Sequence, residues 1–217
     1  LGGLGFLGNS VIESLSAESP RPSIFIASSR KEESRGSTIF VNYGNLQSVK
    51  NLFAKTNPDV ILHLDSRCLR DNSLDSLKKG NVRDDNLVKV ILSNHSHAKM
   101  IFISSMSAFG NSDKKIGPFS FSAESYYGRE KIYMLKKLIE VTSDHEFKFK
   151  VIYPSSIYGK NQEGNMFLPT LLRHIKERKK MFAYGSQKKR DFINVKDVAN
   201  FLKDLITNYP AFKSDHI

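Results

Sequence analysis

Cysteine is almost absent from this chain of 217 residues, and long apolar runs are absent altogether. The single cysteine, Cys68, has no partner for an internal disulfide, whereas a secreted domain of this size usually carries such bridges or another export signal. The longest apolar stretches are of strand length, far below the roughly 20 residues that a membrane helix needs. We therefore expect a cytoplasmic protein with no membrane span and no signal peptide.

Negative charge is also scarce, because 33 Lys and Arg stand against 22 Asp and Glu and leave a formal net charge of +11. Such an excess favours anionic partners: nucleic acid, acidic lipid or phosphorylated small molecules. No RNA-binding signature and no basic helix with base-reading side chains accompanies it, so nucleic acid is not the expected partner. His95 and His97 lack a carboxylate or cysteine at ligand spacing, and no metal site is predicted.

Short apolar runs alternate along the chain with helical patterns. Strands are predicted at 24–27, 38–41, 60–64, 100–103, 149–153 and 181–184, and helices at 9–15, 46–54, 82–92, 126–141, 166–179 and 195–207. Strands of this apolar kind, separated by helices, are typical of a parallel sheet that is covered on both faces. The predicted fold class is therefore α/β.

The chain opens with four glycines in eight residues and passes directly into a helical pattern. Gly3, Gly5 and Gly8 match G-x-G-x-x-G, while Gly2, Gly5 and Gly8 match the wider G-x-x-G-x-x-G. Glycine suits such a turn because the backbone bends sharply and a pyrophosphate must approach the amides at the helix N-terminus, where the helix dipole favours negative charge. The turn predicts a dinucleotide site; a glycine-rich loop without a ligand is the alternative.

The position of this turn leads to a domain prediction. A dinucleotide-binding unit has a strand that feeds its glycine turn, and we expect that strand upstream of Leu1. Residues 1–155 should form a Rossmann-like, doubly wound NAD(P)-binding domain. Residues 156–217 should be a mixed segment, with a small, partly missing substrate-binding region at about 160–189 and a return to the first domain at about 190–207.

The residues some 20 positions past the glycines indicate which dinucleotide is bound. An acidic residue there takes a ribose 2′-hydroxyl, whereas an arginine accommodates a 2′-phosphate. This chain has Ser28, Ser29 and Arg30, with no carboxylate before Glu32. Arg30 could hold a phosphate bidentately, so NADP is favoured over NAD. An exposed basic loop is the other interpretation.

Tyr127 and Lys131 have the spacing i and i+4, which places both on one face of the predicted helix. A free phenol has a pKa of about 10, and a lysine cation within roughly 4 to 6 Å lowers it toward a value useful for proton transfer. The pair alone is common by chance, so an ordinary surface pair is the alternative.

Taken in order, the motifs resemble those of the extended short-chain dehydrogenase/reductases, also called the NAD-dependent epimerase/dehydratase family. The similar segments are Gly-Gly-Leu-Gly-Phe-Leu-Gly at 2–8, Pro-Asp-Val-Ile-Leu-His-Leu-Asp-Ser at 58–66, Ile-Ser-Ser-Met-Ser-Ala-Phe-Gly at 103–110, the Tyr127 and Lys131 pair, Ser-Ile-Tyr-Gly at 156–159 and Arg-Asp-Phe-Ile-Asn-Val-Lys-Asp-Val at 190–198. Asn81 also resembles the asparagine that opens a helix in this family.

The resemblance implies a role for each matched residue. Tyr127 would exchange a proton with a sugar hydroxyl or ketone, Lys131 would hold the nicotinamide ribose and lower the tyrosine pKa, and Ser105 would hydrogen-bond the reacting oxygen. The implied cofactor-binding residues are Gly2, Gly5, Phe6, Leu7, Gly8, Ser28, Arg30, Asn42, Leu64, Asp65, Ser66, Tyr127, Lys131, Pro154 and Ile157. The implied substrate-binding residues are Ser105, Met106, Ser107, Ser156 and Arg190, with Arg190 on the diphosphate of a nucleotide sugar.

Several positions depart from the family pattern. Asn42 stands where an aspartate usually accepts from the adenine, and an amide oxygen can still accept that bond. Asp65 and Ser66 replace small residues, and a carboxylate near the phosphates could weaken dinucleotide binding. Ser156 replaces an asparagine that commonly helps to hold substrate.

Two of the departures limit the reaction. Met106 and Ser107 occupy the place of the Asp-Glu pair found in sugar dehydratases, which argues against dehydration, and Cys68 lies away from the strand where members that epimerise and reduce carry a cysteine. The remaining candidates are a 4-keto sugar nucleotide reductase, which Arg30 and NADP favour, and a 4-epimerase with tightly held cofactor. A dinucleotide sensor without catalysis is a third hypothesis. The family resemblance also predicts a homodimer, formed through the helices beginning near Asn81 and Tyr126.

Overall fold

The computed structural model describes residues 1–30, 37–69, 71–95, 97–110, 121–144, 147–162, 164, 166–182, 189–212 and 215. The helices are α1 (Phe6–Ser16), α2 (Leu46–Thr56), α3 (Leu74–Asn94), α4 (Tyr126–Asp144), α5 (Phe167–Lys176) and α6 (Val195–Thr207), with short 3-10 turns η1 (Met106–Ala108) and η2 (Tyr209–Ala211). The strands are β1 (Ile26–Ser28), β2 (Thr38–Phe40), β3 (Val60–His63), β4 (Lys99–Ile103), β5 (Phe149–Ile152), β6 (Ser156–Tyr158) and β7 (Phe192–Asn194).

The central strands are parallel and form two sets, which Leu1 and Gly2 join into one sheet. β1 pairs with β2, and β3, β4 and β5 pair in that order. Leu1 donates to the carbonyl of Leu62 and accepts from the amide of Leu64, while the Gly2 amide donates to Ala27 in β1. The spatial order is therefore β2, β1, Leu1–Gly2, β3, β4, β5, which brings the glycine turn to the middle of the sheet.

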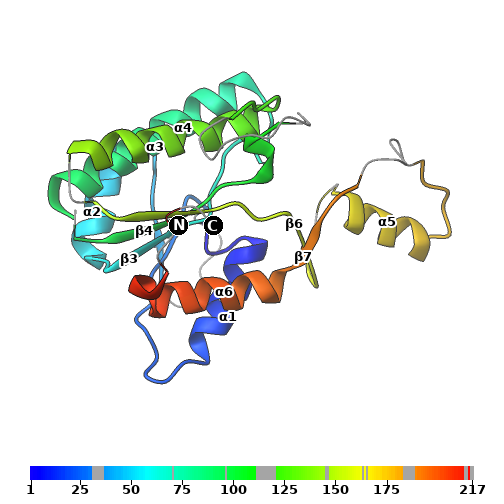
Figure 1. Ribbon diagram of the computed structural model, residues 1–217, viewed down its shortest axis with the longest axis horizontal. Helices are drawn as coiled ribbons and strands as arrows, with labels where there is room; N and C mark the ends of the chain where they lie inside the picture. Colours follow the sequence, from blue (N-terminus) through cyan, green and yellow to red (C-terminus); the bar gives the residue numbers. More distant parts are fainter. Residues whose placement is uncertain are drawn as a thin grey trace.

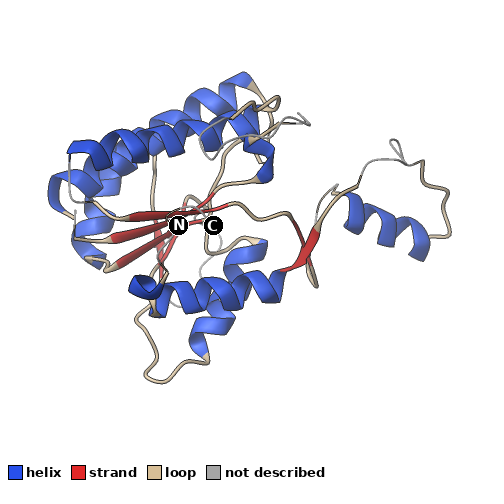
Figure 2. Cartoon of the chain, in the orientation of Figure 1, coloured by secondary structure: helices blue, strands red, loops and turns tan. Residues whose placement is uncertain are grey.

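Helices cover both faces of this sheet (Figures 1 and 2). One hydrophobic cluster joins α2, α3 and α4 to one face through residues such as Phe53, Leu87 and Leu135. The other joins α1 and α6 to the opposite face through residues such as Val11 and Leu202. The predicted α/β fold with a Rossmann-like doubly wound parallel sheet is confirmed. Among the described residues, no helix combines the length and the apolar content needed to cross a bilayer.

Beyond β5, the chain first runs away from the sheet and its covering helices and then returns to them. β6 and β7 form a separate parallel pair, with Ser156 opposite Phe192. α5 lies away from the sheet, at the right of Figure 1, and none of its residues is buried. α6 then returns and packs against α1. The division into a domain at 1–155 and a mixed segment at 156–217 stays a prediction.

Some boundaries differ from those expected. α3 begins at Leu74, eight positions before the predicted helix at 82–92, because Ser73 caps it by accepting from the Ser76 amide and its first turns are polar. The three-residue strands β6 and β7 were not predicted, since so short a run has no readable alternation. Residues 181–182 of the predicted strand 181–184 are not a strand, and the rest of it lies outside the described residues.

Candidate active site

Close packing, and at Gly2 a positive φ, explain the glycines of the first turn. Gly2 has φ +77°, and a Cβ there would lie 2.9 Å from the Asp65 amide nitrogen. A Cβ at Gly5 would lie 3.3 Å from the Gly2 carbonyl oxygen, and one at Gly8 only 2.5 Å from the Gly3 carbonyl oxygen. A Cβ at Gly3 would also be crowded, at 3.0 Å from Cγ2 of Ile26, so the contacts favour glycine at the positions of both spacings.

The glycine turn leads directly into α1, and the amides of the first turn of α1 point out of its N-terminal end. Gly5 is the N-cap, and it offers no side-chain acceptor to these amides. An anion at such an end gains from both the amides and the helix dipole. The local geometry thus fits the pyrophosphate of a dinucleotide.

A cleft beside the turn gathers about half of the predicted cofactor-binding residues. It is lined by Gly2, Leu4, Gly5, Ala27, Ser28, Ser29, Arg30, Tyr43, Leu64, Asp65, Ser66 and Leu69. Tyr43 was missed by sequence reasoning, although its neighbour Asn42 was singled out. Its hydroxyl donates to the carbonyl of Ala27 at 3.3 Å and its ring forms part of the cleft wall.

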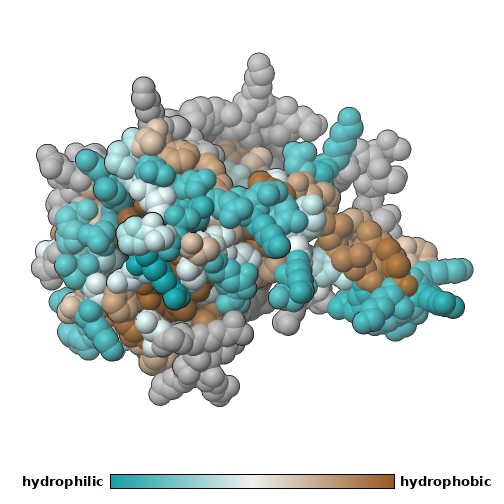
Figure 3. Space-filling model, turned by 90° about the horizontal axis from the view of Figure 1, so that it is seen from below, coloured by the Kyte–Doolittle hydropathy of each residue, from teal (hydrophilic) through white to brown (hydrophobic). Residues whose placement is uncertain are grey.

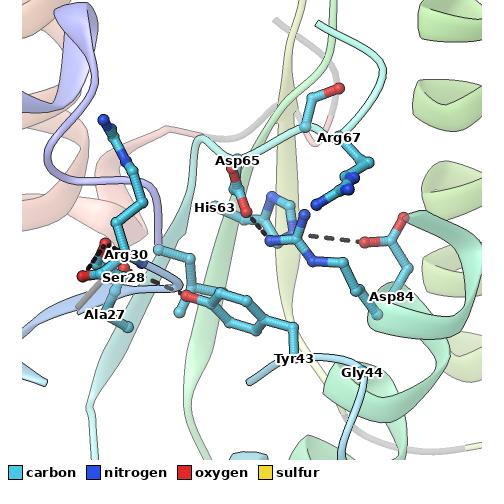
Figure 4. Close-up of polar contacts among 12 residues, drawn as sticks. Ala27, Ser28, Arg30, Tyr43, Gly44, His63, Asp65, Arg67 and Asp84 are labelled. Carbon is cyan, nitrogen blue, oxygen red and sulfur yellow. Dashed lines mark hydrogen bonds and ion pairs between the residues drawn. The ribbon is translucent and has the colours of Figure 1, made fainter. Parts of the chain in front are cut away.

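Ser28 and Arg30 lie together at the end of β1 (Figure 4). The Arg30 amide donates to the Ser28 hydroxyl at 3.1 Å, which holds the start of the basic loop against the strand. Asn42 is exposed and does not line the cleft, because its Oδ1 accepts from the Gly44 amide at 3.1 Å in a tight turn. An adenine contact by Asn42 stays a prediction.

Asp65, the added carboxylate of the cleft, has a cationic partner that sequence reasoning missed. Its side chain forms an ion pair with Arg83 of α3, and the guanidinium of Arg83 also lies 4.7 Å from the centre of the Tyr43 ring. Burial is the largest single influence and would raise the pKa of Asp65, but Arg83, His63 and Lys131 together outweigh it, and the pKa is lowered. Arg83 therefore offsets the charge that was expected to oppose a dinucleotide phosphate.

Tyr127 and Lys131 lie in the first two turns of α4, next to the end of β3. The Lys131 ammonium is 5.7 Å from the centre of the Tyr127 ring and 5.0 Å from that of Phe102. It donates to the Asp65 carbonyl at 3.3 Å and is only 3% exposed. The i, i+4 spacing thus places the Tyr127 ring and the Lys131 ammonium on one face of α4, while their roles in catalysis and coenzyme binding stay predictions.

η1, which follows β4, packs against the same end of α4. A Cβ at Gly128 would collide with the carbonyl oxygen of Ser107, so only glycine allows the two elements to approach this closely. Ser105 caps η1 by accepting from the Ser107 amide at 3.1 Å, and it is half-buried. Met106 and Ser107 are exposed. Ser105, Met106 and Ser107 are therefore neighbours of Tyr127.

The other predicted residues are more scattered. Leu7, Leu64 and Ile157 pack against the α1 and α6 side of the core, and Pro154 is half-buried after β5. Phe6 approaches Gly159, where a Cβ would lie 3.5 Å from its ring. Ser156 and Arg190 are both exposed and lie at the same end of β6 and β7, since the Ser156 amide donates to the carbonyl of Asp191, the residue after Arg190, at 3.1 Å. Neither lines the cleft.

Comparison with known proteins agrees with this geometry. A sequence model of the NAD dependent epimerase/dehydratase family matches residues 1–217. The chain belongs to the NAD-dependent epimerase/dehydratase family. No curated protein matches it.

Solved structures with the same fold include several nucleotide-sugar epimerases. The UDP-glucose 4-epimerase of Thermus thermophilus, in complex with NAD, has a TM-score of 0.78 and 16% identity over 100% of this chain and 74% of its own. The UDP-N-acetylglucosamine 4-epimerase of Bacillus cereus has a TM-score of 0.78 and 20% identity over 95% and 70%. The UDP-Glc/GlcNAc 4-epimerase of Campylobacter jejuni has a TM-score of 0.76 and 18% identity over 99% and 74%.

In this member of the epimerase/dehydratase family, further ionisable groups lie buried behind the cleft. Asp84 of α3 faces His63 at 3.6 Å, and burial raises the pKa of Asp84. Burial, reinforced by the nearby Glu130 carboxylate, raises the pKa of the Cys68 thiol to about 12. Cys68 is thus a poor proton donor at neutral pH. Among the described residues, no group of three or more His, Cys, Asp and Glu could hold a metal ion.

Proposed function

We propose that this protein catalyses NAD(P)-dependent oxidation and reduction at C4 of a nucleotide sugar, with Tyr127 as the proton carrier. The observation that carries the proposal is the position of Lys131, whose buried ammonium lies 5.7 Å from the Tyr127 ring and beside the glycine-lined cleft. A positive charge at that place attracts the negative charge that develops on the phenolic oxygen while Tyr127 exchanges a proton with a sugar oxygen.

Tyr127, Ser105 and Lys131 would each have a separate role in the reaction. Tyr127 takes a proton from, or returns one to, the C4 oxygen, and the hydroxyl of Ser105 donates to the same oxygen and fixes its orientation. Lys131 would hold the nicotinamide ribose through its ammonium group. The nicotinamide, when bound, supplies or accepts the hydride that the protein's own side chains cannot carry.

The coenzyme would be held along the cleft. Gly2, Gly5 and the first turn of α1 would take the pyrophosphate, and Ser28 with Arg30 would take the adenosine ribose. The cleft has no unpaired carboxylate among its described lining residues, since Asp65 is paired with Arg83. We therefore propose NADP as the preferred coenzyme and NAD as the alternative.

The sugar nucleotide would lie across exposed residues of η1 and of one end of the β6 and β7 pair. Met106 and Ser107 flank the reaction centre, while Ser156 and Arg190 lie at the same strand end, where Arg190 would hold the diphosphate. Nothing in this arrangement selects one sugar or one base, so the substrate class is proposed as nucleoside-diphosphate hexoses.

Two net reactions use this same centre. The solved relatives are named as UDP-sugar 4-epimerases, which favours epimerisation with a retained coenzyme. Arg30 in the cleft lining favours NADP and thereby net reduction of a 4-keto sugar, the reaction that the sequence alone ranks first. We now place epimerisation first and reduction second.

The deciding experiment offers the purified protein a panel of UDP- and dTDP-hexoses and 4-keto sugar nucleotides, with NADH or NADPH. Consumption of reduced coenzyme in proportion to product identifies a reductase. Interconversion of two sugar epimers with no net change of coenzyme identifies an epimerase. A Tyr127→Phe variant should bind coenzyme normally and lose turnover by at least about a hundredfold. If that variant turns over at the original rate, Tyr127 is not the proton carrier; if the original protein binds coenzyme but transforms no sugar, it is a dinucleotide sensor.

A further inference from the structure

The buried carboxylate of Glu130 lies between the two residues of the reaction centre along α4, three positions after Tyr127 and one before Lys131. It is 4% exposed and accepts three hydrogen bonds, all from residues 66–68. The donors are the Ser66 hydroxyl, the Arg67 amide at 2.9 Å and the Cys68 amide at 3.0 Å. A helix residue thus binds the backbone of the loop that follows β3.

The same loop is tied to α4 at two other points. The Tyr127 amide donates to Oδ1 of Asn72 at 2.9 Å, and the Lys131 ammonium donates to the Asp65 carbonyl at 3.3 Å. The described residues of the segment 65–72, hereafter the 65–72 loop, therefore contact Lys131, Glu130 and Tyr127 in turn. The part of this loop that the structure describes is held by the very turns of α4 that carry the reaction centre.

The neighbouring helix leaves room for this carboxylate. Gly80 of α3 faces Glu130, and a Cβ at Gly80 would lie 2.9 Å from the Glu130 carboxyl carbon. Within the described residues, no Lys, Arg or His forms an ion pair with Glu130, so its charge is balanced by the loop donors alone. A buried carboxylate held by three donors loses much of its stabilisation when one donor or acceptor is removed.

The opposite side of the 65–72 loop faces the cleft. Asp65, Ser66 and Leu69 line it, and the amide of Asp65 is what a Cβ at Gly2 would strike. Any displacement of the loop would therefore alter both the wall against the glycine turn and the carbonyl that holds Lys131. The contacts of Glu130 thus link the coenzyme cleft to the reaction centre.

We propose that Glu130 is a positioning residue for the coenzyme site, acting through the 65–72 loop rather than by contact with coenzyme or substrate. Its three accepted hydrogen bonds hold residues 66–68 against α4, so that the cleft wall and the Lys131 ammonium keep a fixed relation. This inference rests on the proposed function, since it assumes that a dinucleotide occupies the cleft.

The test compares Glu130→Gln with Glu13→Gln, the same chemical change at an exposed position of α1. Glutamine keeps the shape but offers one accepting oxygen and an NH₂ group to three converging donors. Asn72→Ala is a second variant, chosen because its side chain is exposed and its loss leaves the core intact. NADH and NADPH affinities are measured by calorimetry, well below the unfolding temperature, together with hydrogen exchange of the Arg67 and Cys68 amides.

We expect Glu130→Gln to speed exchange at both amides and to weaken coenzyme binding about tenfold, with a smaller loss for Asn72→Ala and none for Glu13→Gln. Faster exchange with unchanged coenzyme affinity would reduce Glu130 to a structural role and overturn the inference. Unchanged exchange would overturn it as well. If Glu130→Gln does not fold, Asn72→Ala decides alone, and an unchanged coenzyme affinity in it refutes the inference. Failure of the unaltered protein to bind either coenzyme is a different result, because it refutes the proposed function itself.

Discussion

At the scale of single residues, Gly2 shows how one position combines backbone freedom with close approach. Its φ of +77° lies in the left-handed region, and it packs directly against the Asp65 backbone. An L side chain there is strained and also collides with the loop. Gly164 has φ +101°, and a Cβ there would have nothing within 4 Å, so this position isolates the backbone strain.

We therefore expect Gly2→Ala to lower the free energy of unfolding by about 2 to 3 kcal/mol and to weaken coenzyme binding, because strain and collision add. Gly164→Ala should cost only about 1 kcal/mol and leave coenzyme binding unchanged. Urea unfolding and calorimetry measure the two quantities. Equal losses in the two variants would show that contact with Asp65 has no effect.

The ion pair of Asp65 and Arg83 predicts a dependence of stability on pH. Because the pKa of folded Asp65 is below its ordinary value of 3.8, the ionised form stabilises the fold at pH values above 3.8, and this contribution is lost as the pH falls through the folded pKa. The difference in unfolding free energy between the protein and Asp65→Asn should thus be full at neutral pH and shrink in acid. Asp75→Asn, at an exposed pair with Lys79, should show little difference at any pH. A gap for Asp65→Asn that is constant from neutral to acid pH would contradict this interpretation.

At the scale of elements, the first turn of α4 and η1 form one unit. Gly128 permits their contact, and Ser105 and Tyr127 lie on its two sides. We expect Gly128→Ala to push η1 away and to lower turnover more than coenzyme affinity, because the loop that holds Lys131 is left in place. Gly44→Ala, where a Cβ meets only an ordinary contact at 3.4 Å, is the matched control. Steady-state kinetics and coenzyme titration separate the two effects; an equal fall in both would place the damage in the coenzyme site.

The elements also show what sequence can and cannot predict. The helix at 126–141 was predicted almost in full because its apolar stripe is long, and the spacing of Tyr127 and Lys131 led to the proposal of a reaction centre on it. Arg83, Asn72 and Glu130 were not predicted, since their contacts reach across a loop to another element and leave no periodic trace. The strands β6 and β7 were not predicted, because three residues are too few to show the alternation of a strand.

At the scale of the whole molecule, two groups of helices carry exposed apolar side chains that a partner could cover. One is α5 alone, whose Phe167, Leu172 and Ile175 are 45%, 65% and 63% exposed, and which lies under the brown area at the right of Figure 3. The other is α3 and α4, where Val82 is 50% and Ile139 37% exposed. Exposed apolar groups gathered in this way are typical of surfaces that another chain or segment covers.

The homodimer predicted from the family resemblance distinguishes these two surfaces. If α3 and α4 form its interface, Val82→Lys and Ile139→Lys together should lower the mass measured by light scattering from a dimer to a monomer, because each change places a charge in an apolar contact. Leu172→Lys on α5 should leave the mass unchanged. Neither set touches the coenzyme cleft, so coenzyme affinity should be preserved in both and serves as the check on folding. A mass that falls with Leu172→Lys instead would move the interface to α5, and a monomer before any substitution would refute the dimer.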